Sequence, residues 1–150
     1  MFRKVIIAVA TAALVIWTAG AQEPGKGTSA ILLSTDAETL AEAHDIVMNA
    51  LLANDVDIKA DNSEYYITKA AGQPTRSGSE VTCSIACLEM DGRIVIRVSG
   101  AYRSPLDNFR TEDKVIKQGA RGSIAMQVWN SMYETAMLIP HTAVDYIGSY

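Results

Sequence analysis

The two cysteines are the first residues to weigh for chemistry. They stand in the stretch "VTCSIACLEMDGRIVIRV", residues 81–98, as Cys83 and Cys87. On one strand, residues four apart point the same way but lie roughly 13 Å apart, at about 3.3 Å per residue. A disulfide requires Cα atoms within about 7 Å, so the two do not bond to each other. We interpret both as small apolar core residues. If the chain leaves the reducing cytosol, its cysteines would be expected to pair, so a bond to another chain stays open.

His44 is the one further ligand that we consider for a metal site with the cysteines. Zinc sites need three or four converging ligands, and C-x-x-x-C on a strand lacks the close spacing of a zinc knuckle. A lone histidine beside an apolar helix face is more often hydrogen-bonded or half-exposed. We therefore predict no metal and no cofactor, and Cys83, Cys87 and His44 stay only as candidates.

Other motifs of catalysis or ligand binding are missing from the sequence. The acids Asp55, Asp57, Asp61 and Glu64 lack the glycine turn and distal bidentate acid of a calcium loop, and we interpret them as a solvated strand edge and turn. The chain has neither a Gly-x-Ser-x-Gly elbow nor a glycine-rich phosphate loop. The sequence therefore predicts a protein that is not an enzyme.

The cysteines belong to the clearest structural pattern in the chain, a β-hairpin. Asp91-Gly92 separates two alternating runs, which is the strongest short signal for a two-residue turn. The turn sets the register, so that Met90 faces Arg93. The expected facing pairs further along are Leu88 with Val95, Cys87 with Ile96, Ala86 with Arg97, Ile85 with Val98, Cys83 with Gly100, and Val81 with Tyr102. Both cysteines then share one apolar face.

Two helices are expected to flank the strands. The first follows "TDAE", a capping box with Thr35 as N-cap and Glu38 three residues later, and ends at Asn54 in a left-handed conformation. The second covers residues 123–139, with Ser123 as its cap and Pro140 after its end. Further strands are expected at 30–33, 56–60 and 64–70. The pattern predicts an α+β domain, an antiparallel sheet with two helices on one face in the order β-α-β-β-β-α.

The N-terminal residues have the three parts of a secretory signal peptide. Arg3 and Lys4 precede an apolar run, and Ala19-Gly20-Ala21 is a small-x-small cleavage site. The run is shorter than the roughly 20 residues that span a bilayer. An uncleaved N-terminal anchor stays the alternative. We expect residues 1–21 to be removed, 22–29 to be a flexible leader, 30–139 one domain, and 140–150 a tail.

The run "STDAETLAEAHDIVMNALLANDVDIKADNSEYYITKA", residues 34–70, resembles the opening of many small exported bacterial proteins of unknown function. The resemblance, a pattern over about residues 30–139, implies a TATA-binding-protein-like or helix-grip fold, which lipoproteins of outer-membrane assembly also use. It carries no catalytic residues. The lipoprotein members have a lipid-attachment cysteine that is missing after the apolar run here.

We expect an exported protein, periplasmic or secreted, that binds a protein partner or itself, or is a structural component of the envelope. Removing the signal changes the formal net charge from −4 to −6, which disfavours nucleic acid. No transmembrane segment is expected in the mature chain. The alternative is a carrier of a small molecule or lipid in the groove between helix and sheet, lined by Met48, Met126, Met132 and Met137.

The second face of the hairpin is the expected contact surface. It is not uniformly polar, because apolar side chains lie beside two arginines. Its residues are Leu88, Met90, Arg93, Val95 and Arg97. Apolar patches rimmed by polar groups tend to mark contacts. Alternatively, the tail folds over them with Val144, Tyr146 and Ile147.

Overall fold

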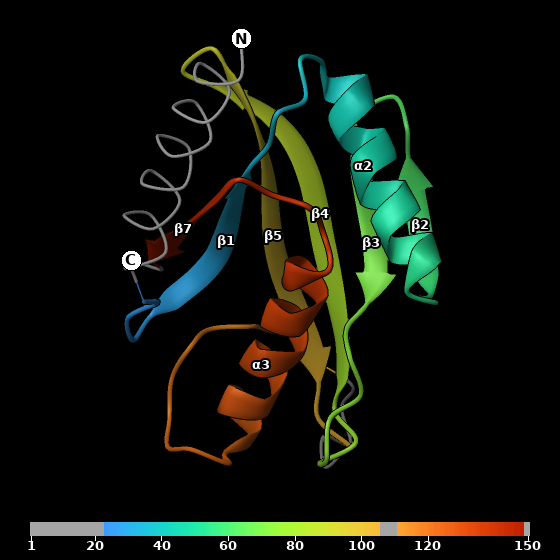
Figure 1. The fold of residues 1–150 in the computed structure, drawn as a ribbon. Coiled ribbons are helices and arrows are strands. Elements are labelled where there is room, and N and C mark those ends of the chain that lie inside the picture. Colours follow the sequence, from blue (N-terminus) through green and yellow to red (C-terminus); the bar gives the residue numbers. More distant parts are fainter. Residues whose placement is uncertain (1–22, 106–110, 149–150) are drawn as a thin grey trace, which may run out of the picture.

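A computed structural model describes residues 23–105 and 111–148. The predicted signal peptide, 1–21, lies outside the described residues. The described part is α+β, with two helices and a seven-stranded antiparallel sheet (Figure 1). The strands are β1 (Thr28–Ser34), β2 (Ile58–Asn62), β3 (Ile67–Ala71), β4 (Glu80–Met90), β5 (Arg93–Arg103), β6 (Asp113–Lys114) and β7 (Ala143–Gly148). The helices are α2 (Leu40–Ala53) and α3 (Ile124–Met137).

The sheet is larger than the sequence indicates, and the predicted order β-α-β-β-β-α is wrong. Its strand order is β2-β3-β4-β5-β1-β7, and the short β6 pairs with the far end of β5. Four strands and β6 separate the two helices, and β7 follows α3. The first strand also begins at Thr28, inside the predicted leader, where Thr28 and Ser29 are buried.

The segment predicted as a tail is the strand β7. It pairs with β1, with Leu33 facing Val144 and Ile31 facing Tyr146. This pairing joins segments from opposite ends of the described chain, so no local pattern of residues indicates it. As a result β1 is an inner strand, and its Ile31 and Leu33 are fully buried.

The β4–β5 hairpin has the predicted register. Met90 faces Arg93, Leu88 faces Val95 and Cys87 faces Ile96, and the ladder continues without a shift to Glu80 and Arg103. Asp91 and Gly92 both have positive φ, 53° and 74°, as a type I′ turn requires. The prediction is confirmed because both strands alternate in step with this turn.

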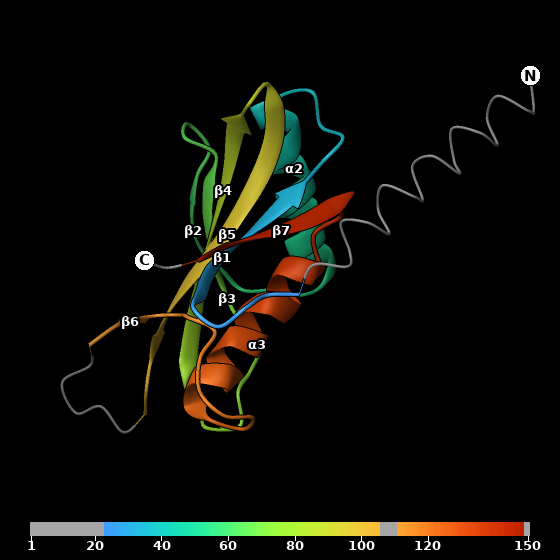
Figure 2. The same cartoon turned by 90° about the vertical axis from the view of Figure 1, so that its left-hand side faces the viewer.

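One face of the sheet, which we call the core face, carries the buried side chains. On β4 these are Val81, Cys83, Ile85 and Cys87, and on β5 they are Ile96 and Val98. Thr68 on this face contacts Met48 of α2, and Cys83 is hydrogen-bonded to Thr135 of α3. A Cβ at Gly100 would lie only 3.0 Å from the Met132 sulfur, so glycine permits this close approach of α3. Figure 2 shows α2 and α3 to the right of β4 and β5.

The first helix begins four residues later than predicted. Thr39 is its N-cap, with its hydroxyl accepting from the Glu42 amide at 3.1 Å, while the Glu42 carboxylate accepts from the Glu38 amide at 2.9 Å. The sequence contains two consecutive Thr-x-x-Glu motifs, at 35–38 and 39–42, and the second is used. At the other end Asn54 is the C-cap with φ −106°, and the left-handed residue is Asp55. Ser123 caps α3, as predicted.

Candidate functional site

The cysteines lie on the core face of β4, away from solvent. Cys83 is fully buried and Cys87 is 3 % exposed, and both are free thiols. Burial raises the pKa of Cys83 to about 12, although a hydrogen bond with Thr135 lowers it slightly, and burial raises the pKa of Cys87 to about 11. Both thiols are therefore protonated at neutral pH, and the thiolate needed for attack or metal binding is scarce.

The histidine that the sequence paired with the cysteines is bound elsewhere. His44 Nε2 lies 2.8 Å from Asp61 Oδ1, and its ring meets that of Tyr66 edge-on with centroids 6.0 Å apart. Within residues 23–105 and 111–148, no three His, Cys, Asp or Glu side chains converge as metal ligands would. The structure therefore does not bring Cys83, Cys87 and His44 together.

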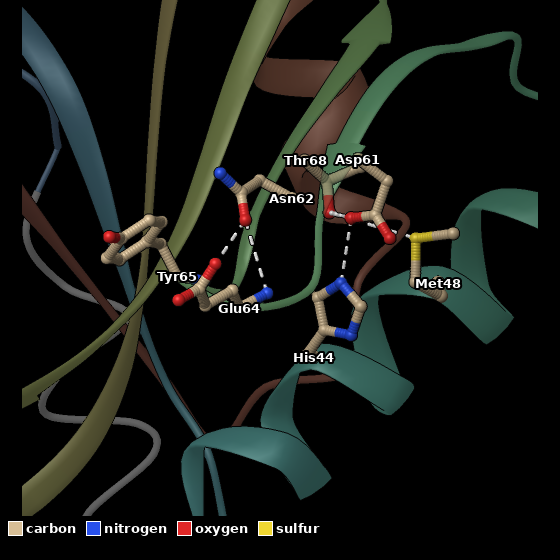
Figure 3. Close-up of polar contacts among 7 residues, drawn as sticks. All are labelled: His44, Met48, Asp61, Asn62, Glu64, Tyr65 and Thr68. Atoms are coloured by element: carbon tan, nitrogen blue, oxygen red, sulfur yellow. Dashed lines mark hydrogen bonds and ion pairs between the residues drawn. The ribbon is translucent and has the colours of Figure 1, made fainter.

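A polar cluster of His44, Asp61 and Thr68 joins α2 to strands β2 and β3 (Figure 3). The Thr68 hydroxyl donates to the same Asp61 oxygen at 3.0 Å, and it also lies 3.7 Å from the Met48 sulfur. The hydrogen bond with His44 holds the pKa of Asp61 below its usual 3.8; burial opposes this shift and Thr68 reinforces it. The cluster thus connects a helix to the strands beside it through an ionised carboxylate.

The geometry of this cluster does not suit nucleophilic catalysis. In a nucleophile–histidine–acid relay the hydroxyl is hydrogen-bonded to the imidazole. Here the hydroxyl and the imidazole both bind Asp61, and Thr68 is 1 % exposed. The cluster is therefore a structural link. The sequence interpretation placed Asp61 in a solvated strand edge and turn, and the residue is indeed exposed on the edge strand β2. What the sequence did not indicate is its hydrogen bond with His44, 17 residues away.

The turn after β2 is held by Asn62. Its side-chain oxygen accepts from the amides of Glu64 and Tyr65 at 3.2 and 3.3 Å (Figure 3). Tyr66 then adopts a φ of 56°, in the left-handed region. The turn between the strands expected at 56–60 and 64–70 therefore lies further along the chain, and β3 begins at Ile67. This places Tyr65 and Ile67 at the surface, 65 % and 38 % exposed.

The predicted contact residues gather on the face opposite the core face, which we call the outer face. Leu88 faces Val95, Met90 faces Arg93, and Ala86 lies between Ile67 on one side and Arg97 on the other. Leu88 and Val95 are half-buried, Met90 is 42 % exposed, and both arginines are exposed. The register brings all five predicted residues, Leu88, Met90, Arg93, Val95 and Arg97, onto one surface.

Two open hollows lie where the chain enters α2. One, of about 510 Å³, lies beside Ile46, Ala50 and His141, and the other, of about 740 Å³, lies between Leu40 and the hairpin residues Glu89 and Arg93. Neither has a methionine among its lining residues. Of the four methionines predicted to line a groove, Met132 is fully buried in the core.

The chain matches no protein-family model, and no curated protein is similar to it in sequence. Its function therefore has to be argued from its own residues. Among the helices of the described residues, none is both long and apolar enough to cross a membrane.

Proposed function

We propose that this protein is an exported, non-enzymatic domain that binds a protein partner through the outer face of its sheet. Export is argued from residues 1–21, which have the composition of a cleaved signal. The binding role is argued from the outer face, because the side chains that looked chemical in the sequence have internal structural uses. Cys83 and Cys87 fill the core, and His44 holds Asp61.

The observation that carries the proposal is an apolar surface with exposed arginines beside it. Leu88, Val95 and Met90 present apolar atoms on neighbouring strands, and Arg93 and Arg97 stand next to them. Among the described residues neither arginine forms an ion pair. Apolar patches rimmed by polar groups mark contact sites, and methionine and arginine are enriched in interfaces.

We infer that both helices pack on the core face and leave the outer face open. The contacts of α2 through Thr68 and of α3 through Cys83 and Gly100 are all on the core face. The alternative cover for the outer face was the C-terminal segment with Val144, Tyr146 and Ile147. These residues lie in β7, which pairs with β1. Two strands, β5 and β1, separate β7 from Leu88.

The test is site-specific cross-linking in the envelope and medium of the expressing host. A photoreactive side chain at Val95 should give a discrete adduct, and the same group at the exposed Ala120 should not. Changing Leu88 to Asp should abolish the adduct while the unfolding transition stays cooperative. Equal adducts from both positions, or none from Val95, would contradict the proposed function.

A further inference from the structure

The molecule separates its charges between two surfaces. From Gly27 to Ile58 the sequence has no lysine or arginine, and its acids there are Asp36, Glu38, Glu42, Asp45, Asp55 and Asp57. Exposed residues of α2 recur at helical spacing: Glu42, Asp45, Asn49 and Leu52. We call these four the acidic stripe. Leu52, the last of them, is 60 % exposed.

The outer face has the opposite charge balance, although the whole chain has a formal net charge of −4. Strand alternation and register assign charged residues to this face. The cations are Lys69, Arg93, Arg97, Arg103 and Lys114, and the anions are Glu80 and Asp145. Arg103 is paired with Glu112 at 3.2 Å. Arg93 and Arg97 remain available at the apolar centre of the face.

We propose that the partner of the outer face is a second copy of this chain, which docks through its acidic stripe. This inference rests on the proposed function and names its partner. A helix packed on an open sheet face is a standard layer arrangement. Carboxylates of the stripe would reach Arg93 and Arg97, whose guanidinium groups bind carboxylates well. Leu52 would meet the exposed Met90 and Ile67.

The two surfaces differ, so the contact is head-to-tail. Such contacts build open chains or closed rings, because the assembly keeps one unused outer face at one end and one unused acidic stripe at the other until a ring closes. Exposed charge pairs are screened over a Debye length of about 8 Å in physiological salt. The association is therefore sensitive to salt and to protein concentration.

Sedimentation velocity of the protein, as processed by the expressing host, tests this inference. The weight-average mass should rise with concentration at about 0.05 M salt and return to that of the monomer at about 0.5 M salt. The variant R93E/R97E and the variant D45K/L52K should each be monomeric at low salt. The variant R76E/R121E, which changes the net charge as much as R93E/R97E does at exposed loop positions, should associate like the wild type.

A mixing experiment separates this contact from a symmetric one. R93E/R97E keeps its acidic stripe, and D45K/L52K keeps its outer face. An equimolar mixture of these two monomeric variants should form a heterodimer that grows no further, since only one intact pair of surfaces is present. A mixture that stays monomeric would overturn the head-to-tail contact, as would a wild-type protein that is monomeric at low salt.

Failure of the self-association can be distinguished from failure of the proposed protein-binding function. If the wild type is monomeric but the Val95 cross-link still gives a discrete adduct, the outer face binds a different protein, and only the self-association is wrong. If the wild type is monomeric and binds vesicles of anionic phospholipid in a manner lost in R93E/R97E, the face recognises lipid, and both proposals fail.

Discussion

Side chains with reactive groups are used here for packing and for internal hydrogen bonds. Cys83, fully buried, is in contact with α3, and Cys87 lies nearer the hairpin turn on the same face. His44 and Asp61 satisfy each other at the edge of the core. The sequence singles out each of these residue types as chemically interesting, but their chemistry depends on burial and partners, which spacing in the sequence does not reveal.

Replacing either cysteine with alanine should lower the free energy of unfolding by roughly 1 kcal/mol, because each change leaves a small cavity in the core. Urea unfolding of C83A and C87A measures the loss. In the folded protein both thiols should react with a thiol reagent only slowly, since their pKa values are raised to about 12 and about 11. A disulfide-linked dimer on non-reducing gels, abolished by these changes, would show that the thiols are not core groups.

The Asp61 carboxylate should make stability depend on pH in the acid range. Its pKa in the folded protein lies below 3.8, so the folded state favours the ionised form. The contribution is fully present above about pH 4 and is lost as the pH falls through the folded pKa. Thermal unfolding between about pH 2 and pH 6 should show a smaller decline in D61N than in the wild type. The matched control is D57N at an exposed position, whose decline should equal that of the wild type.

The N-terminus of α2 shows which of two equivalent capping motifs in the sequence begins the helix. Both Thr35 and Thr39 precede a glutamate by three residues. Thr39 is used, and Thr35 only accepts a hydrogen bond from the Ala37 amide at 3.3 Å. Because the helix starts at Leu40, residues 35–39 form the connection between β1 and the helix. The buried face of the helix then includes Ala43, Val47 and Leu51.

Thr39→Ala should therefore lower the free energy of unfolding by about 1 kcal/mol, the usual cost of losing a cap. Thr35→Ala should cost clearly less, and chemical denaturation compares the two variants directly. Equal losses would mean that the helix begins elsewhere.

The Asp91-Gly92 turn offers a second test at the scale of an element. Gly92 has a φ of 74°, and a Cβ at this position would meet no other atom within 4 Å, so alanine there is strained only through its backbone. Gly92→Ala should lower the free energy of unfolding by about 1 kcal/mol. Gly25→Ala, which also meets nothing within 4 Å and has no positive φ, should be nearly neutral. The two variants are compared by urea unfolding.

At the scale of the whole molecule, β7 completes the sheet. Removing residues 143–150 would expose the edge of β1 and uncover Ile31 and Leu33, which are now fully buried. Exposed apolar strand edges promote aggregation. The truncated protein should be markedly less stable and should aggregate on heating, as measured by light scattering. The variant Leu88→Asp with Val95→Asp on the outer face should unfold at nearly the wild-type temperature; a similar loss of stability in both proteins would mean that the outer face is itself covered.

The sequence by itself determined the features that depend on neighbours along the chain. The hairpin register followed from Asp91-Gly92 and the alternation on either side, and the cap of α3 followed from Ser123. The same register placed Leu88, Met90, Arg93, Val95 and Arg97 on one surface.

Only the tertiary structure decided the features that join distant segments. The pairing of β7 with β1 and the contact of His44 with Asp61 each depend on a partner that local periodicity does not specify. The physical reason is that a strand edge or a partly exposed carboxylate is stabilised by whichever group the folded chain brings to it, and several candidates in the sequence satisfy the local rules equally well.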